Sequence, residues 1–159
     1  MSPTASLITR RAALWLLGAL PAVHVLSAKA EARPLVVVNK DRSCGCCGAW
    51  AKHLERAGFP VRIIDTADLQ AVKQRLGVPS ELASCHTAEM QGYVLEGHVP
   101  VAAILRLLAE WPKATGLAVP GMPIGSIGME GGRPEIYEVV LFTPEGKTSY
   151  GRFLEDRPV

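Results

Sequence analysis

Short strand patterns alternate with helix patterns along most of this 159-residue chain. The β-branched run 35–38 is typical of a buried strand, and residues 46–57 then carry apolar side chains at helical spacing until Gly58 ends the helix. The alternation continues with a strand at 59–64, a helix at 67–76, a helical turn at 79–81, a strand at 92–95 and a helix at 101–111. This order predicts an α/β fold in which helices cover the faces of a sheet.

The C-terminal part of the chain adds a loop and a hairpin to this pattern. Residues 116–134 are rich in glycine and proline and lack periodicity, which predicts a structured loop. The strand patterns 136–142 and 148–153 flank a turn signal and indicate a β-hairpin. We expect a central mixed sheet flanked by helices, a Gly/Pro-rich loop insertion and a terminal hairpin. A hydrophobic content of 48% and a charged content of 20% suit one globular domain over 33–159.

Residues 1–32 have the features of a cleaved export signal. A basic pair precedes an apolar stretch of 15 residues (12–26), and small-residue cleavage patterns follow at 28–30 and 30–32. A membrane anchor is the competing interpretation, but this stretch contains proline and histidine and is shorter than the roughly 20 residues that span a bilayer. We therefore expect a periplasmic protein, exported by the Sec or the twin-arginine route, with no membrane span in the mature chain.

The charge distribution argues against nucleic acid as a partner. The formal net charge is +2, but all 15 acidic residues lie at or after Glu31, so residues 31–159 carry 14 bases against 15 acids. No basic stripe with interleaved aromatic residues is present in this nearly neutral body. A nucleic-acid-binding protein would be expected to show one.

All four cysteines lie in two short segments, Cys44-Gly45-Cys46-Cys47-Gly48 and Cys85-His86. The flanking glycines allow the backbone to turn tightly, so that several sulfurs can point toward one place. A helix that begins near Cys46 has unpaired N–H groups and a positive end, which lower thiol pKa values. Thiolates are the form that attacks disulfides and binds metals, so both chemistries remain open.

Three interpretations of the cysteines compete. Two structural disulfides would be stable in an oxidising compartment, although the adjacent Cys46 and Cys47 would form a strained bridge if paired. A thiol-disulfide enzyme would use the C-x-x-C pair Cys44 and Cys47, and would not need Cys46 or Cys85. A cluster of soft cations, in contrast, uses several thiolates, some of them bridging. The number and spacing of the cysteines favour a metal site.

Other soft donors extend the candidate ligand set toward Cu(I) rather than zinc, because thioethers join thiolates in it. His86 follows Cys85 directly and His98 lies at a turn between a strand and a helix, so each is a ligand candidate, with a structural role as the alternative. Met122 lies among glycines and prolines, where no core stripe explains it, and a ligand or lid role is favoured. His53 lies among charged residues and is expected to be solvated.

Several segments together resemble the CopG-like family of bacterial copper-resistance proteins. They are Cys44-Gly45-Cys46-Cys47-Gly48-Ala49-Trp50, Cys85-His86-Thr87, Gly92-Tyr93-Val94-Leu95-Glu96-Gly97-His98-Val99-Pro100, and Gly116-Leu117-Ala118-Val119-Pro120-Gly121-Met122-Pro123 with Gly125-Ser126. The resemblance covers about Leu35 to Phe153. It implies a thioredoxin-like fold, a periplasmic location and copper bound in a cysteine-bridged cluster. It implies Cys44, Cys46, Cys47 and Cys85 as thiolate ligands, with His86, His98 and Met122 as further ligands.

The thioredoxin fold gives this expectation a geometry. Its reactive cysteines lie where the first strand runs into the first helix, and a cis proline faces them just before a terminal hairpin. Residues 44–47 occupy the first place in this chain. With the predicted hairpin at 136–153 as the terminal hairpin, the Met122-Pro123 bond would occupy the place of the cis proline. We therefore expect this bond to be cis.

The leading hypothesis is a periplasmic protein that holds more than one Cu(I) ion and contributes to copper resistance, with copper redox chemistry as a weaker second claim. Its partners would be copper ions and other periplasmic copper-handling proteins. The alternative is a thioredoxin-like thiol-disulfide oxidoreductase that uses Cys44 and Cys47. A third hypothesis is a disulfide-stapled scaffold that binds a partner protein.

Overall fold

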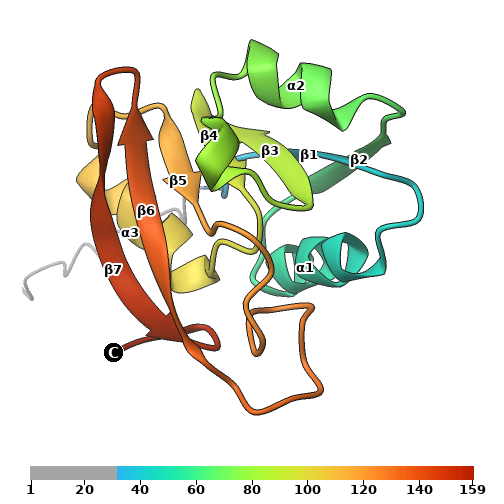
Figure 1. Cartoon of the computed structure of the whole chain (residues 1–159), viewed down its shortest axis with the longest axis vertical. Coiled ribbons are helices and arrows are strands. Elements are labelled where there is room, and N and C mark those ends of the chain that lie inside the picture. The colour runs from blue at the N-terminus through green and yellow to red at the C-terminus, as the bar shows by residue number, and fades with distance from the viewer. Residues whose placement is uncertain (1–31) are drawn as a thin grey trace, which may run out of the picture. The chain divides into compact units, whose positions relative to one another are not determined.

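A mixed sheet runs through residues 32–159, the part of the chain that the computed structural model describes (Figure 1). The strands are β1 (Val36–Lys40), β2 (Val61–Asp65), β3 (His86–Met90), β4 (Tyr93–Glu96), β5 (Gly116–Ala118), β6 (Ile136–Thr143), β7 (Gly146–Leu154) and β8 (Arg157–Pro158). The helices are α1 (Gly45–Arg56), α2 (Leu69–Arg75) and α3 (Val101–Glu110), with a 3-10 turn, η1, at Ser80–Leu82. The predicted export signal lies outside the described residues, apart from Ala32.

The eight strands follow the order β2-β1-β3-β4-β5-β6-β7-β8. The pairs β1/β2 and β4/β5 are parallel, and every other neighbouring pair is antiparallel. The predicted α/β architecture with a mixed sheet is therefore confirmed, as is the hairpin formed by β6 and β7. Within residues 32–159, no helix is both long and apolar enough to cross a membrane.

Two apolar clusters cover the two faces of the sheet. The larger one joins side chains of β1, such as Val36 and Val38, to Trp50 and Leu54 of α1 and to Ile104 of α3. The alternation of inward residues along a strand explains why Val36 and Val38 share a face. The smaller cluster lies under η1 and contains five buried residues, Leu82, Val94, Ala118, Val140 and Phe142. Figure 1 accordingly shows α1 and α2 on opposite sides of the sheet.

Three strands were not expected from the sequence. They are β3, the short β5 inside the Gly/Pro-rich region, and β8 at the C-terminus. The strand β3 is the important one, because it lies between β1 and β4 and forms a hairpin with β4. This hairpin, rather than the one formed by β6 and β7, is the one that precedes α3.

The expected cis bond at Met122-Pro123 is wrong. The peptide bonds of the described residues are all trans, and the Met122 side chain is 51% exposed. The prediction failed because it was aligned on the β6–β7 hairpin. The residue that directly precedes the β3–β4 hairpin and faces the start of α1 is Cys85.

Candidate metal centre

The first cysteine segment lies at the junction between β1 and α1. Cys44 is the residue before the helix, and its backbone N–H donates to the carbonyl of Asp41 at 3.1 Å. The Lys40 ammonium group closes the same turn by donating to the carbonyls of Asp41 and Arg42. This turn places Cys46 and Cys47 in the first turn of α1, where unpaired helix N–H groups favour negative charge.

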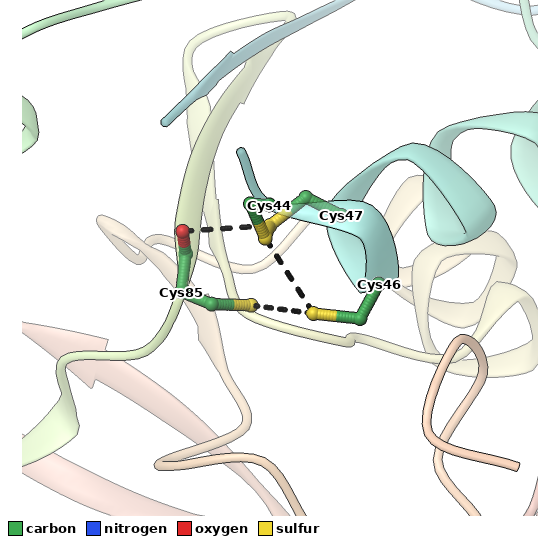
Figure 2. Close-up of side chains that lie close together, drawn as sticks. All are labelled: Cys44, Cys46, Cys47 and Cys85. Atoms are coloured by element: carbon green, nitrogen blue, oxygen red, sulfur yellow. Dashed lines mark hydrogen bonds between the residues drawn. A yellow bond between two sulfur atoms is a disulfide. The ribbon is translucent and has the colours of Figure 1, made fainter. Parts of the chain in front are cut away.

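The fold brings the sulfurs of all four cysteines within 4.8 Å of one another. Cys44 and Cys47 form a disulfide, while Cys46 and Cys85 carry free thiols. The Cys46 sulfur lies 3.5 Å from the Cys44 sulfur and 3.9 Å from the Cys85 sulfur (Figure 2). The structure thus unites two segments that are 38 residues apart in sequence, as the cluster hypothesis requires.

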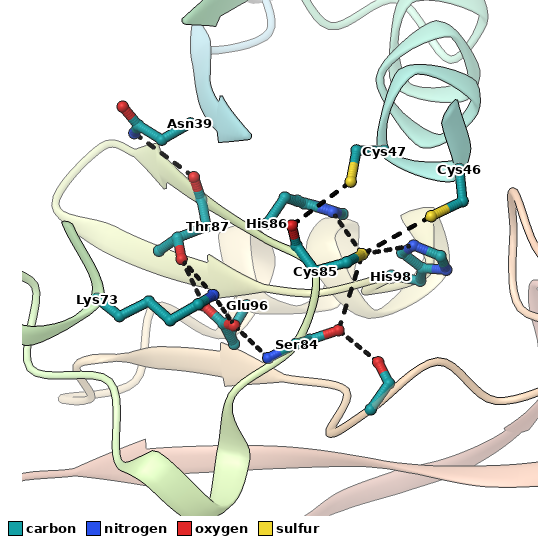
Figure 3. Close-up of polar contacts among 11 residues, drawn as sticks. Asn39, Cys46, Cys47, Lys73, Ser84, Cys85, His86, Thr87, Glu96 and His98 are labelled. Carbon is teal, nitrogen blue, oxygen red and sulfur yellow. Dashed lines mark hydrogen bonds and ion pairs between the residues drawn. The ribbon is translucent and has the colours of Figure 1, made fainter. Parts of the chain in front are cut away.

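Two buried imidazoles adjoin the Cys85 sulfur. Nε2 of His98 lies 3.1 Å from it and Nδ1 of His86 lies 3.4 Å from it (Figure 3). Both rings are completely buried, and the His86 ring packs against Trp50 with a centroid separation of 4.3 Å. Cys85, His86 and His98 therefore form a second group of donor atoms beside the four sulfurs.

Burial keeps these groups uncharged in the metal-free protein. Loss of hydration lowers the pKa of His98 to about 4, against a weak opposing effect of Glu130, and it lowers the pKa of His86 well below its ordinary value. Burial, together with the nearby Cys46 thiol, raises the pKa of Cys85 to about 12. At neutral pH the centre thus contains neutral imidazoles beside a protonated Cys85 thiol. A cation that binds there would displace the thiol proton.

A serine that the sequence analysis did not single out fixes the orientation of His98. The Ser126 hydroxyl donates to the carbonyl of Pro123 at 2.7 Å and lies 3.0 Å from Nδ1 of His98. A hydroxyl has one hydrogen, so the Ser126 oxygen accepts from Nδ1–H of the ring. The lone pair of His98 is therefore on Nε2, the nitrogen that faces Cys85. The only sequence signal was the position of Ser126 in the Gly125-Ser126 motif.

A buried ion pair positions the segment that carries Cys85. The Lys73 ammonium group contacts the carboxylate of Glu96, and both side chains are almost inaccessible to solvent. Thr87 shares the pair by accepting from Lys73 at 3.0 Å and donating to Glu96 at 2.6 Å. Glu96 also accepts the backbone N–H of Ser84 at 2.5 Å, which fixes the residue just before Cys85. The sequence analysis did not identify this network, which Figure 3 shows.

Met122 and His53 make none of these contacts. The loop that carries Met122 passes beside Ser84. Gly121 forms a β-bridge with Ser84, and its carbonyl accepts a hydrogen bond from the Ser84 hydroxyl. The Met122 side chain is half exposed, so its role as a ligand remains a prediction. His53 lies 3.4 Å from Asp156 and belongs to neither group of donor atoms.

Comparison with known proteins agrees with the sequence resemblance. A family model described as "Protein of unknown function, DUF411" matches residues 82–129. A solved structure described as copper resistance protein copG, Form 2, is 47% identical, with a TM-score of 0.72, and the match covers 76% of this chain and 98% of that one. This chain belongs to the CopG family. The structure of copG, Form 1, is similar at 48% identity and a TM-score of 0.71, covering 75% and 96% of the two chains.

The family match covers the second half of the centre. Residues 82–129 include Cys85, both buried histidines, Glu96 and Ser126, whereas the first three cysteines lie before the matched segment. The CopG structures extend the likeness over most of the chain. No curated protein gave a significant match.

Proposed function

We propose that this protein is a periplasmic copper-binding protein that holds Cu(I) in a cysteine-thiolate cluster and contributes to copper resistance. The observation that carries the proposal is the approach of four cysteine sulfurs to within 4.8 Å of one another at the start of α1. Membership of a family named for copper resistance supports copper as the metal. The predicted export signal supports the periplasm as the location.

The donor set fits a soft closed-shell cation. Thiolates can bridge neighbouring Cu(I) ions, so that four sulfurs would hold more than one ion, and imidazole nitrogens are compatible additional donors. We propose Cys44, Cys46, Cys47 and Cys85 as the thiolate ligands, with His86, His98 and Met122 as further ligands. Reduction of the Cys44–Cys47 disulfide has to precede formation of this cluster, because only thiolates are strong ligands.

The order of the strands and α-helices from β1 to α3 supports a thioredoxin-like fold. The order β1-α1-β2-α2-β3-β4-α3, with the C-x-x-C segment between β1 and α1, matches the expected position of reactive cysteines. In this alignment Cys85, rather than Pro123, is the residue that faces the C-x-x-C segment just before the hairpin. A thiol ligand would then take the place of the proline, which favours metal binding over disulfide exchange.

Competition titration tests the copper proposal. The reduced protein should bind more than one Cu(I) per chain in competition with a Cu(I) chelator, and it should prefer Cu(I) strongly over Zn(II), which favours a closed tetrahedral site. A stoichiometry of one zinc with no retained copper would contradict the cluster.

The disulfide between Cys44 and Cys47 favours a second candidate function, thiol-disulfide exchange. The variant Cys46→Ser separates the two, because a dithiol enzyme does not need Cys46. We expect Cys46→Ser to lose copper, while the control Ala49→Ser, which adds a hydroxyl to the same helix, retains it. Unchanged copper stoichiometry together with robust disulfide reductase activity would support the enzyme instead. Interconversion of Cu(I) and Cu(II) is a further proposal, which voltammetry of the copper-loaded protein tests.

Met122 is a proposed ligand with a tuning role. A neutral thioether adds little binding free energy beside anionic thiolates, but it influences which copper oxidation state is preferred. We expect Met122→Ala to weaken Cu(I) binding or to shift the copper potential without loss of the cluster. The control is Met129→Ala in the same loop. Identical behaviour of the two variants and the wild type would assign Met122 no role at the metal.

A further inference from the structure

The disulfide form of the centre still contains an intact set of metal donors. Cys85, His86 and His98 offer donor atoms within 4.8 Å of one another, and none of them takes part in the disulfide. The free Cys46 thiol adds a second sulfur at 3.9 Å from the Cys85 sulfur. We propose that the oxidised protein holds one closed-shell soft cation between Cys85, His98 and Cys46, in addition to the multi-ion cluster of the reduced protein. This inference rests on the proposed copper function.

Two distances to the Cys85 sulfur are close to those expected around a single metal ion. Bonds of about 2.3 Å to sulfur and about 2.0 Å to nitrogen in tetrahedral geometry separate two sulfur ligands by roughly 3.8 Å and a sulfur from a nitrogen by roughly 3.5 Å. The observed separations are 3.9 Å between the Cys46 and Cys85 sulfurs and 3.1 Å between the Cys85 sulfur and Nε2 of His98. Cys46 and His98 do not share a group of donor atoms within 4.8 Å of one another, so one of these side chains has to move toward the other when the ion binds.

His86 supplies a further donor at the same place. Its ring is completely buried, its Nδ1 lies 3.4 Å from the Cys85 sulfur, and its Nε2 has no hydrogen-bond partner among residues 32–159. Coordination through Nδ1, the nitrogen that faces the Cys85 sulfur, would supply a fourth ligand to the ion.

Cys85 and His98 are held in place by contacts that do not involve the disulfide. Cys85 is fixed through Ser84 by Glu96, and His98 is fixed by Ser126, all on the side of the centre that belongs to β3, β4 and the Gly/Pro-rich loop. The disulfide lies on the α1 side, where the Cys47 sulfur faces the carbonyl of Cys85 at 3.5 Å (Figure 2). Oxidation removes two thiolate ligands but leaves the other half of the centre assembled.

The state of the disulfide would then set how many ions one chain holds. A dithiol reductant converts the form with one ion to the form with the cluster: its two thiols become a disulfide, and the Cys44–Cys47 bond takes up two electrons and two protons to give two thiols. Re-formation of the Cys44–Cys47 bond requires a disulfide, which accepts the two electrons and two protons and becomes two thiols. Metal capacity would thus follow the thiol-disulfide balance of the compartment.

Titration with Ag(I), a closed-shell analogue of Cu(I), tests the inference on the purified protein. The oxidised form is first identified by mass spectrometry of an alkylated aliquot, which should carry two alkyl groups rather than four, and the mass is checked again after titration. We expect one retained Ag(I) per chain in the oxidised protein and more than one after reduction with dithiothreitol and its removal. The double variant Cys44→Ser/Cys47→Ser, which cannot form the disulfide, should also retain one Ag(I) per chain.

Single variants locate the ion. In the oxidised protein, Cys85→Ser and His98→Ala should each weaken Ag(I) binding at least about tenfold, as expected for loss of a ligand. The control His53→Ala, in the last turn of α1, should leave Ag(I) binding unchanged. If the oxidised protein retains no Ag(I) while the reduced protein binds several ions, the inference is wrong and the proposed function stands. If the reduced protein also binds none, the proposed function fails as well. Retention of Ag(I) by both ligand variants would place the ion elsewhere and overturn the inference.

Discussion

The Cys85 sulfur lies 3.1 Å from Nε2 of His98 because the two residues flank a β-hairpin at equivalent positions. In the register of this hairpin Thr87 pairs with Glu96, so the residue before β3 comes to lie across from the residue that follows Gly97 after β4. Antiparallel pairing brings such side chains into contact. The hairpin therefore assembles a sulfur and a nitrogen donor before any residue of α1 is added.

Loss of the Ser126 hydroxyl should disturb the centre without unfolding the protein. Ser126→Ala removes the acceptor for Nδ1–H of His98, so the ring can rotate or change tautomer. We expect Cu(I) affinity to fall about 10- to 100-fold, the usual effect of removing a partner of a metal-binding histidine. Nitrogen-15 NMR of the imidazole should show the altered tautomer in the same variant.

Two controls accompany this variant. Ser149→Ala on β7 removes an exposed hydroxyl and should change neither the affinity nor the tautomer. Ser126→Thr retains a hydroxyl and should restore the His98 tautomer. A Ser126→Ala protein with the wild-type tautomer and affinity would contradict a positioning role for Ser126.

The ion pair between Lys73 and Glu96 should be essential for the stability of the fold. Glu96→Gln leaves the Lys73 charge buried without its partner, a change that typically costs about 3 to 5 kcal/mol. The matched control is Glu89→Gln, which breaks the solvent-exposed pair with Arg75 and should cost less than about 1 kcal/mol. Urea unfolding of the metal-free proteins measures both changes. Equal effects on the free energy of unfolding would show that burial of the first pair is unimportant.

Gly97 should tolerate no side chain, because two separate costs meet there. Its φ of +71° disfavours any residue with a Cβ, and a Cβ at this position would lie 2.6 Å from the carbonyl oxygen of Val119 and 2.5 Å from the hydroxyl of Ser84. Gly92 has a similar φ of +84° but open space around it. Gly92→Ala should therefore cost about 1 to 2 kcal/mol, and Gly97→Ala clearly more.

The Gly97→Ala variant should also weaken copper binding, because the displaced Ser84 is adjacent to Cys85. Titration of the two glycine variants with Cu(I) checks this expectation. If Gly92→Ala and Gly97→Ala lose equal stability and equal affinity, the close approach of Ser84 to Gly97 has no consequence.

The sequence revealed the donors better than the framework that aligns them. The cysteine and histidine candidates could be identified because thiol and imidazole side chains lie close together in short sequence motifs, and both are metal-binding groups. The strand β3 could not be identified from the sequence, because the polar side chains of His86, Thr87 and Glu89 interrupt any apolar run. These polar side chains are tolerated in a strand only through partners that are distant in sequence, such as Lys73 for Thr87. Local patterns contain no information about such partners.

The same omission explains the wrong geometry at Met122. Without β3, the β6–β7 hairpin was the only candidate for the terminal hairpin of a thioredoxin-like fold, and Met122-Pro123 then served as the proline motif before it, although Pro134 lies closer to β6. Ser126 was overlooked for a related reason. A serine in a loop has no distinctive pattern, and its role follows only from the fold, which places it against Nδ1 of His98.

The two buried histidines should make the metal-free protein sensitive to mild acid. The pKa of His98 is about 4 in the folded protein, because burial disfavours the charged ring, against about 6.5 in the unfolded chain. Between these values the unfolded chain binds more protons, so folding stability is complete above about pH 6.5 and falls as the pH drops toward 4. The shift of His86 has the same sign.

The loss from His98 alone should reach about 2.5 kcal/mol at pH 4.5, since each pKa unit corresponds to about 1.4 kcal/mol. Urea unfolding of chelator-treated protein at pH 7 and at pH 4.5 measures it, and pH 4.5 is high enough to limit the contribution of protonated carboxylates. His98→Gln removes this titration, so its stability should fall less steeply between the two pH values than that of the wild type, even though it is less stable at pH 7. Parallel pH profiles for the two proteins would show that His98 is not held neutral by burial, and the proposed state of the metal-free centre would then be wrong.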